Sequence, residues 1–145
     1  MANAAYPLFL QALMDLTSGS DLNDGDLRVI GVNTTGAGTL YTYSAAHDFL
    51  DDVAAGSRVA VSATIANTTV ALGVLDGDDT TLSGTGGDSI EALIFYLHTG
   101  VDSTSRLVAY LDTGVGGLPY TPPGGAWSVD VVFDSGTNKI MKIGP

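Results

Sequence analysis

The sequence predicts an all-β protein, an antiparallel sandwich of the jelly-roll or Greek-key type. Residues 90–143 hold four apolar runs rich in β-branched and aromatic residues, and Gly, Asp, Ser, Asn or Pro fills each gap between them. The same alternation of apolar runs and turn residues recurs upstream, which gives about eight strands in all. Strands do not alternate steadily with long helices, so a parallel sheet is not expected.

Length and composition indicate one domain with a sizeable core. The chain has 145 residues, of which 45% are hydrophobic and 14% are charged, and this length suits one compact domain. We expect an N-terminal arm or short helix with its polar connection over residues 1–26, and a single β-sandwich domain over residues 27–145. Cysteine is absent, which excludes disulfides and thiolate chemistry. Stability must therefore come from burial.

The N-terminal segment leaves two alternatives open. Tyr6, Phe9 and Leu13 recur at three- and four-residue spacing, which gathers them on one side of a helix, and Pro7 fits the first helical turn. This apolar side either closes one end of the domain's own core or forms an arm that packs on a neighbouring subunit. No positively charged region precedes the apolar stretch and no run approaches the roughly 20 residues of a membrane span, so neither a signal peptide nor a membrane partner is expected.

The first half of the sandwich begins with residues 27–33, LRVIGVN, which are apolar on nearly both faces and predict a central strand. TLYTY at 39–43 predicts a second strand. Residues 44–56 break this pattern, because Phe49, Leu50 and Val53 fall at helical spacing. We therefore expect a short helical connection that Gly56 closes.

The middle of the chain predicts two further strands and a long loop. Residues 57–66 alternate, with Val59, Val61, Ala63 and Ile65 on one face. Residues 69–75, TVALGVL, predict one continuous strand. Residues 76–89 are polar and glycine-rich, so they predict a flexible loop.

The last third of the chain contains the clearest strands. Residues 90–98 are apolar on both faces in their middle, which predicts a central strand. The prolines of residues 119–125 cannot donate ladder hydrogen bonds, so this stretch predicts a loop. Trp127 then opens a strand with alternating faces, and residues 139–143 close the sheet.

The charge of the chain limits its partners. The formal net charge is −11, from 16 acidic and five basic residues, and the basic residues form no cluster. A phosphate backbone would be repelled, so nucleic acid is not expected as a partner. The acidic surface instead favours docking on a basic patch of another protein.

No combination of residues points to catalysis. His47 lies beside Asp48 and near Ser44, but residues this close in sequence do not generally converge as a nucleophile, base and orienting group must. Adjacent acidic pairs in turns are also unlike the opposed carboxylates of glycosidases. We therefore expect neither an enzyme nor catalytic residues.

Ion and cofactor sites are not expected either. A calcium loop that begins at Asp21 would need an oxygen ligand at its fifth position, where Gly25 stands, and a Glu at its twelfth. The glycine-rich stretch at Gly86-Gly87 lacks a following lysine, and Asp88 would repel phosphate. Trp127 and the tyrosines could form a carbohydrate platform, but at strand spacing such residues are more often core and rim packing.

The second half of the chain resembles a group of small structural proteins of tailed bacteriophages. The resemblance rests on IEALIFYLHTGVDSTSRLVAYLDTG, followed by a loop and by WSVDVVFDSGTNKIMKI. It is specific over residues 90–143 and looser upstream, where His47, Phe49 and Leu50 stand in a stretch that the group also carries. The region 57–75 departs from the group, which shows a more polar hairpin there.

The resemblance implies a non-enzymatic, jelly-roll-like virion protein, with capsid cement or decoration as its role. Such a protein binds the outside of the head shell across capsid subunits and opposes internal DNA pressure, and many symmetric copies add avidity. Its partners would be the major capsid protein and further copies of itself, as a dimer or trimer. It would lie on the outer capsid surface of the virion and in the host cytoplasm during assembly.

We expect docking through the N-terminal face around Tyr6, Phe9 and Leu13 and through Pro122 and Trp127. The alternative role is a tail or head-fibre component that binds a host receptor or glycan. That role predicts Tyr and Trp side chains along an exposed groove.

Overall fold

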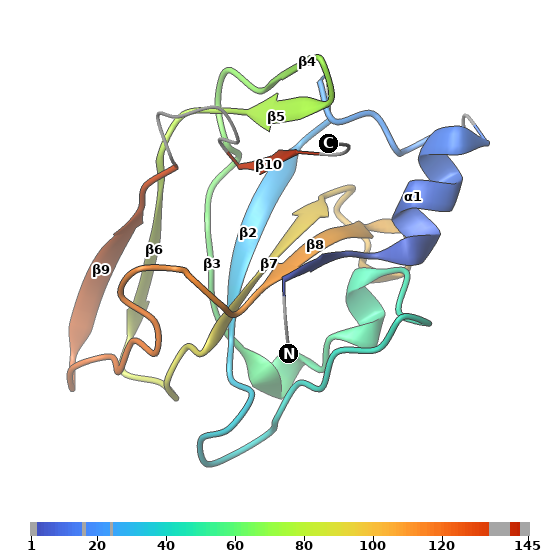
Figure 1. The fold of residues 1–145 in the computed structure, drawn as a ribbon. Coiled ribbons are helices and arrows are strands. Elements are labelled where there is room, and N and C mark those ends of the chain that lie inside the picture. The colour runs from blue at the N-terminus through green and yellow to red at the C-terminus, as the bar shows by residue number, and fades with distance from the viewer. Residues whose placement is uncertain (1–2, 16, 24, 134–139, 143–145) are drawn as a thin grey trace.

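A five-stranded antiparallel sheet forms the centre of the computed structural model, which describes residues 3–15, 17–23, 25–133 and 140–142 (Figure 1). Its spatial order is β1, β8, β7, β2, β3. These strands are β1 (Ala4–Ala5), β2 (Leu27–Val32), β3 (Arg58–Val61), β7 (Ala92–Leu97) and β8 (Arg106–Leu111). The predicted all-β antiparallel sandwich is confirmed.

The central strands are apolar because both of their faces are covered. All six residues of β7 are buried, as are five of the six residues of β2. The two strands pair with Val29 opposite Phe95 and Ile30 opposite Ile94. Successive side chains of a strand point to opposite faces of its sheet, so this continuous burial requires material on both sides. The predicted central strands at 27–33 and 90–98 are confirmed.

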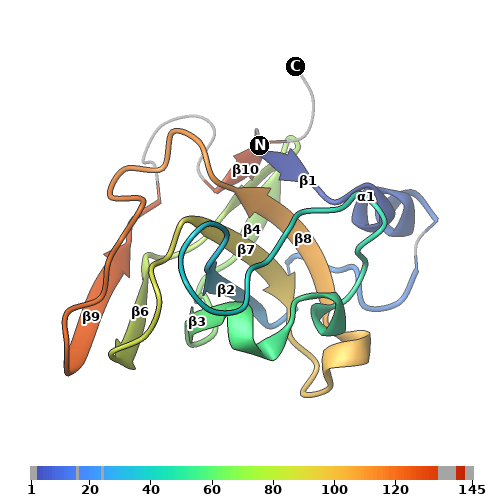
Figure 2. The ribbon, with the colours of Figure 1, turned by 90° about the horizontal axis from the view of Figure 1, so that it is seen from below.

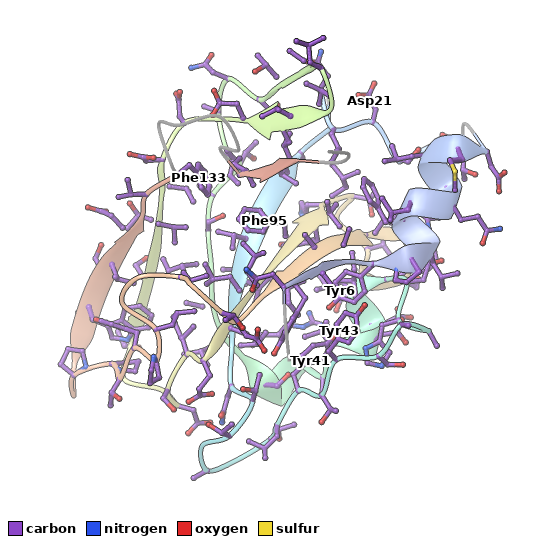
Figure 3. The ribbon with its side chains drawn as sticks, in the orientation of Figure 1. Tyr6, Asp21, Tyr41, Tyr43, Phe95 and Phe133 are labelled. Atoms are coloured by element: carbon purple, nitrogen blue, oxygen red, sulfur yellow. The ribbon has the colours of Figure 1, made fainter. Side chains whose placement is uncertain are left out.

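Two smaller sheets cover part of the central sheet. One is a two-stranded ribbon of β6 (Thr80–Thr85) and β9 (Ala126–Val131), and the other joins β10 (Met141–Lys142), β5 (Val74–Asp76) and β4 (Thr69–Ala71) in that order. Phe133, just after β9, packs against Phe95 with ring centroids 5.9 Å apart (Figure 3). The ribbon therefore bends over the central sheet and shares its core.

The connection between β2 and β3 carries aromatic residues onto the central sheet. Tyr41 and Tyr43 lie against Tyr110 of β8, with ring centroids 6.1 and 5.4 Å away. Short 3-10 turns follow at Leu50–Asp52 and Ala55–Ser57, and another lies at Asp102–Thr104. The predicted helical connection is thus present as two separate turns.

The N-terminal segment belongs to the core of the sandwich. β1 pairs with β8, with Ala4 opposite Tyr110, and helix α1 (Pro7–Met14) follows, with Pro7 in its first turn. Tyr6 and Phe9 are completely buried. Of the two alternatives for this segment, the structure has the one in which a short helix closes one end of the domain's own core. The segment before residue 27 is therefore not an arm separate from the sandwich, because β1 and α1 pack within it.

Two predicted strands differ from the structure. TLYTY at 39–43 is irregular: the Tyr41 N–H donates to the carbonyl oxygen of Asn33 at 2.8 Å, and Leu40 is exposed. The strand predicted over 57–66 is shortened to β3. Beyond β3, the Ser62 side chain accepts from the N–H of Val29 and donates to the carbonyl of Ala63. Local hydrogen bonds of this kind compete with a regular ladder.

The segment from 69 to 89 also differs. The run predicted as one strand over 69–75 is a hairpin of β4 and β5, with a turn at Leu72-Gly73. The predicted flexible loop contains β6, whose residues are exposed or half-buried except for the buried Leu82. Gly84 of β6 lies under the indole of Trp127, where an added Cβ would come within 3.0 Å of the ring. A side chain at position 84 would therefore require the indole to shift by a few tenths of an ångström, which favours glycine there.

Candidate docking surface

The five residues predicted to dock do not form one exposed face. Tyr6 and Phe9 are buried inside the chain's own core, so their prediction as docking residues is wrong. Their helical spacing was identified correctly, but the partner of that apolar side is the sandwich itself. Leu13, on the same helix, is half-buried.

Strand β9, which contains Trp127, lies on the other side of the fold from α1 (Figure 1). Trp127 is buried: its Nε1–H donates to the carbonyl oxygen of Gly86 at 2.7 Å, and its ring packs on Tyr120 with centroids 5.4 Å apart. Pro122 is half-buried in the loop before β9. Trp127 therefore does not present an exposed ring for docking on a capsid, because the ring is covered within the chain and its N–H is already hydrogen-bonded.

Leu13 borders a small apolar groove between α1 and the β4–β5 hairpin. Leu22, Val70 and Leu75 line the same groove, which has a volume of about 230 Å³. Val70 is 47% exposed, and Met14, which follows Leu13 at the end of α1, is 77% exposed. Asp21, labelled in Figure 3, marks this end of the molecule. Apolar side chains thus reach solvent around the groove.

The turn of the β4–β5 hairpin presents Leu72 to solvent. Ala71 pairs with Val74, so only Leu72 and Gly73 form the loop. Both have positive φ, 51° and 77°, as a two-residue hairpin turn of type I′ requires, and such turns prefer Asn-Gly. A leucine with positive φ is uncommon and costs roughly 1–2 kcal/mol. Leu72 is nevertheless 99% exposed, so no contact within the described chain offsets that cost.

We name Leu13, Met14, Val70 and Leu72 the apical patch. Leu13 and Val70 line the groove, Met14 follows Leu13 at the end of α1, and Leu72 lies at the tip of the hairpin that carries Val70. A single exposed leucine needs no explanation, but several large apolar residues together mark an interaction site. The sequence signal that could have found the hairpin is the Leu-Gly dipeptide inside TVALGVL. A glycine in a strand pattern indicates a turn or bulge.

The charged surface restricts what the patch can bind. All three arginines are held by aspartates: Arg28 with Asp26 at 2.8 Å, Arg58 with Asp102 at 2.8 Å, and Arg106 with Asp48. Arg28 lowers the pKa of the Asp26 carboxyl by hydrogen bonding and by its charge. With the arginines engaged in these pairs, the formal charge of −11 favours a partner whose contact surface is basic.

A network of buried tyrosines, with half-buried Tyr43 and His47 at its margin, lies on the opposite side of the central sheet from Phe133. The hydroxyls of Tyr6 and Tyr41 are 2.6 Å apart, and the Tyr41 hydroxyl lies 2.9 Å from His47 Nδ1 (Figure 3). Tyr43 packs on Tyr6 with ring centroids 5.2 Å apart. The network ties the N-terminus to the connection between β2 and β3.

The protonation of these tyrosines indicates a structural role. Burial raises the pKa of Tyr41 to about 12 and that of Tyr110 to about 12. Burial also raises the pKa of Tyr6. A phenol with a raised pKa stays neutral and is a poor base or nucleophile at neutral pH. The network therefore fits hydrogen bonding within the core rather than acid-base catalysis.

Neither a metal-binding cluster nor a membrane-spanning helix is present in the part of the chain that the structure describes. Over residues 3–15, 17–23, 25–133 and 140–142, no three His, Asp or Glu side chains gather as a metal ion would require. The described helix is too short to cross a bilayer.

No protein-family model matches the chain, and no curated protein matches it either.

Proposed function

We infer that the chain is a non-enzymatic cement, or decoration, protein of a tailed-phage head. It binds the outside of the shell across capsid subunits and stabilises the shell against internal DNA pressure. The observation that carries this proposal is Leu72, which combines full exposure with a left-handed backbone at a turn that asparagine would fit better. The resemblance of residues 90–143 to tailed-phage structural proteins supports the virion role.

The apical patch is the docking surface. Backbone strain at an exposed position is an indication of function when the fold itself gains nothing from it. Burying a leucine side chain on a partner contributes about 1.5–3 kcal/mol. Such a contact is weak alone, but symmetric shells offer many identical sites, and copies that bridge subunits gain avidity. The short β4–β5 turn holds Leu72 in a defined position, which lowers the ordering cost on binding.

The partner is the major capsid protein, through an apolar depression with a basic rim. The net charge of −11 would be attracted to such a rim and would speed association at low salt. The engagement of all three arginines in ion pairs with aspartates supports a protein partner over a nucleic acid. The protein would act on the outer capsid surface after assembly in the host cytoplasm.

The alternative role in a tail or head fibre has less support. A glycan platform needs exposed aromatic faces, but Tyr41, Tyr96, Tyr110 and Trp127 are buried. These residues account for most of the aromatic side chains on which that alternative depended. The apical patch is aliphatic, which suits a protein surface better than a sugar ring.

The test is binding to purified, fully expanded head shells of the virion that carries the protein, stripped of it beforehand. Leu72→Asn removes the exposed side chain and relieves the turn. Leu40→Asn is the matched control, because Leu40 is 46% exposed and belongs to the connection between β2 and β3, outside the β4–β5 hairpin and the groove beside it. Co-sedimentation should fall at least about tenfold for Leu72→Asn, since avidity multiplies each lost contact, and should be unchanged for Leu40→Asn.

Equal loss in both variants, or full binding by Leu72→Asn, would contradict docking through the apical patch. Circular dichroism of each variant shows whether its fold is retained. Failure of the wild-type protein itself to bind stripped shells would contradict the cement role.

A further inference from the structure

The outer edge of β9 carries an interaction surface that is separate from the apical patch. In the described part of the chain β9 pairs only with β6, through six residue pairs from Thr85 opposite Ala126 to Thr80 opposite Val131. Both views place β9 at the margin of the fold with no labelled element beyond it (Figures 1 and 2). One side of this strand therefore presents backbone N–H and C=O groups to solvent.

Open sheet edges usually carry features that prevent pairing with another strand, such as lysine, proline or an inward-pointing charge. β9 reads Ala-Trp-Ser-Val-Asp-Val and contains neither lysine nor proline. Its one charge, Asp130, points away from the core side and accepts a hydrogen bond from the Thr81 hydroxyl at 3.0 Å. β9 is thus a six-residue edge without the usual protection.

The two faces of β9 differ in a way that selects the incoming strand. Val129 and Val131 line a hollow of about 540 Å³ between the ribbon and the central sheet. Trp127 lies on the same face of the strand, two residues before Val129. Val129 and Val131 are only half-buried. An added strand would continue this face, so it should carry apolar residues at alternate positions.

We propose that β9 pairs with β9 of a second copy, antiparallel and about a two-fold axis perpendicular to the sheet. β9 itself has the required chemistry, with apolar residues at every second position on its inner face. The two-fold axis keeps the inner faces of both strands on the same side of the joined sheet. The contact is isologous, so each residue pair occurs twice except at the axis.

The sequence of β9 selects one register. Inner-face residues must oppose inner-face residues, and only the pairing with Val129 opposite Val129 of the second copy matches all three inner residues within β9. Trp127 then opposes Val131, and Ser128 opposes Asp130, so no like charges face each other. Val132, which is 70% exposed just after β9, opposes Ala126 and loses part of its contact with water. Apolar pairs of this kind stabilise antiparallel strands.

Six-residue strands bury less area than a permanent dimer needs, so the dimer dissociates at low concentration. Both copies are acidic, with a charge of −11 each, and salt therefore strengthens the association by screening their repulsion. Sedimentation velocity of the full chain from micromolar to near-millimolar concentration should show a monomer–dimer equilibrium that shifts toward dimer as salt is raised.

Charge substitutions test the surface. Ser128→Asp places Asp residues opposite both copies of Asp130 and should weaken dimerisation about tenfold. Ser83→Asp adds the same charge at an exposed position of β6, the ladder partner of Ser128, and should weaken it much less. Equal effects of the two variants would overturn the proposal, as would a chain that stays monomeric.

Single cysteines test the register, since the chain has none of its own. The pairing brings the two copies of position 129 to a Cα separation of about 4.5–5.5 Å, within disulfide range. Val129→Cys should therefore crosslink at least about tenfold faster than Ser83→Cys under mild oxidation. No difference between the two would overturn the register. A dimer that Leu72→Asn abolishes and Ser128→Asp leaves intact would assign self-association to the apical patch and overturn the proposal.

Discussion

Strands β7 and β4 are both built of residues that favour sheets, but every residue of β7 is buried and every residue of β4 is exposed. β7 lies between two other strands, with packed layers on both of its faces. β4 lies at the edge of a three-stranded sheet and leads directly into Leu72. Folding alone accounts for the apolar residues of β7. The exposed apolar residues of the hairpin need a second reason, which we assign to binding.

Removal of residues 1–14 should produce the largest effect of any change considered. Tyr6 and Phe9 are completely buried, and losing a buried aromatic side chain costs about 3–5 kcal/mol. Two such losses approach the whole stability of about 5–15 kcal/mol of a typical domain. The truncated chain should show no cooperative unfolding transition by circular dichroism. A cooperative transition near that of the full chain would mean that the segment is a dispensable arm.

A matched pair of truncations sharpens the contrast between core and hairpin. Phe95→Ala in β7 should destabilise the protein by about 3–5 kcal/mol, because it leaves a cavity beside Phe133. Val70→Ala in β4 should change stability by less than about 0.5 kcal/mol, since Val70 is half in water. Urea denaturation measures both values. Similar losses in the two variants would show that the hairpin is part of the core.

The buried tyrosines predict a loss of stability at high pH. In the unfolded chain tyrosines ionise near pH 10, whereas burial holds the pKa of Tyr41 and Tyr110 at about 12 in the folded state. The stabilisation is fully present below pH 10 and is lost as pH rises toward 12, because the unfolded state then releases protons that the folded state retains.

Tyrosinate absorbance should therefore increase together with the loss of ellipticity. Tyr41→Phe should lose less stability than the wild type across the same pH range. If all six tyrosines ionised near pH 10 while the protein stayed folded, that result would contradict the burial of the network.

A substitution that relieves the backbone strain of the hairpin turn should have the smallest effect on stability and is the most informative test. Leu72→Asn should raise stability by about 0.5–1 kcal/mol, because asparagine adopts positive φ more readily than leucine. Thermal denaturation would detect this as a higher Tm. A stabilised protein that has lost shell binding is the expected trade-off between stability and function. A decrease in stability would mean that Leu72 makes a contact within the fold.

The sequence predicts the central strands well, and the periphery less well, for physical reasons. Residues 27–33 and 90–98 are apolar on both faces, a pattern that few structures other than a covered strand can satisfy. β6 was missed because its apolar content is one leucine, Leu82, and its stability comes from pairing with β9. Such pairing is a tertiary contact, which local sequence does not report.

The candidate site was predicted only in part, because exposure depends on the whole fold. Periodicity placed Tyr6, Phe9 and Leu13 on one side of a helix, but it does not say whether that side meets the chain's own sheet or a partner. The sheet covers the first two and leaves Leu13 at the groove. The local sequence predicts Leu72 as part of a strand, and only the pairing of Ala71 with Val74 reveals the turn.

An image reconstruction of the parent particle tests most directly whether the apical patch docks the protein on a phage head. We predict sandwich-sized density outside the shell, with the β4–β5 hairpin and the end of α1 against capsid subunits. Density confined to the tail, or on the shell with the hairpin turned toward solvent, would contradict the account.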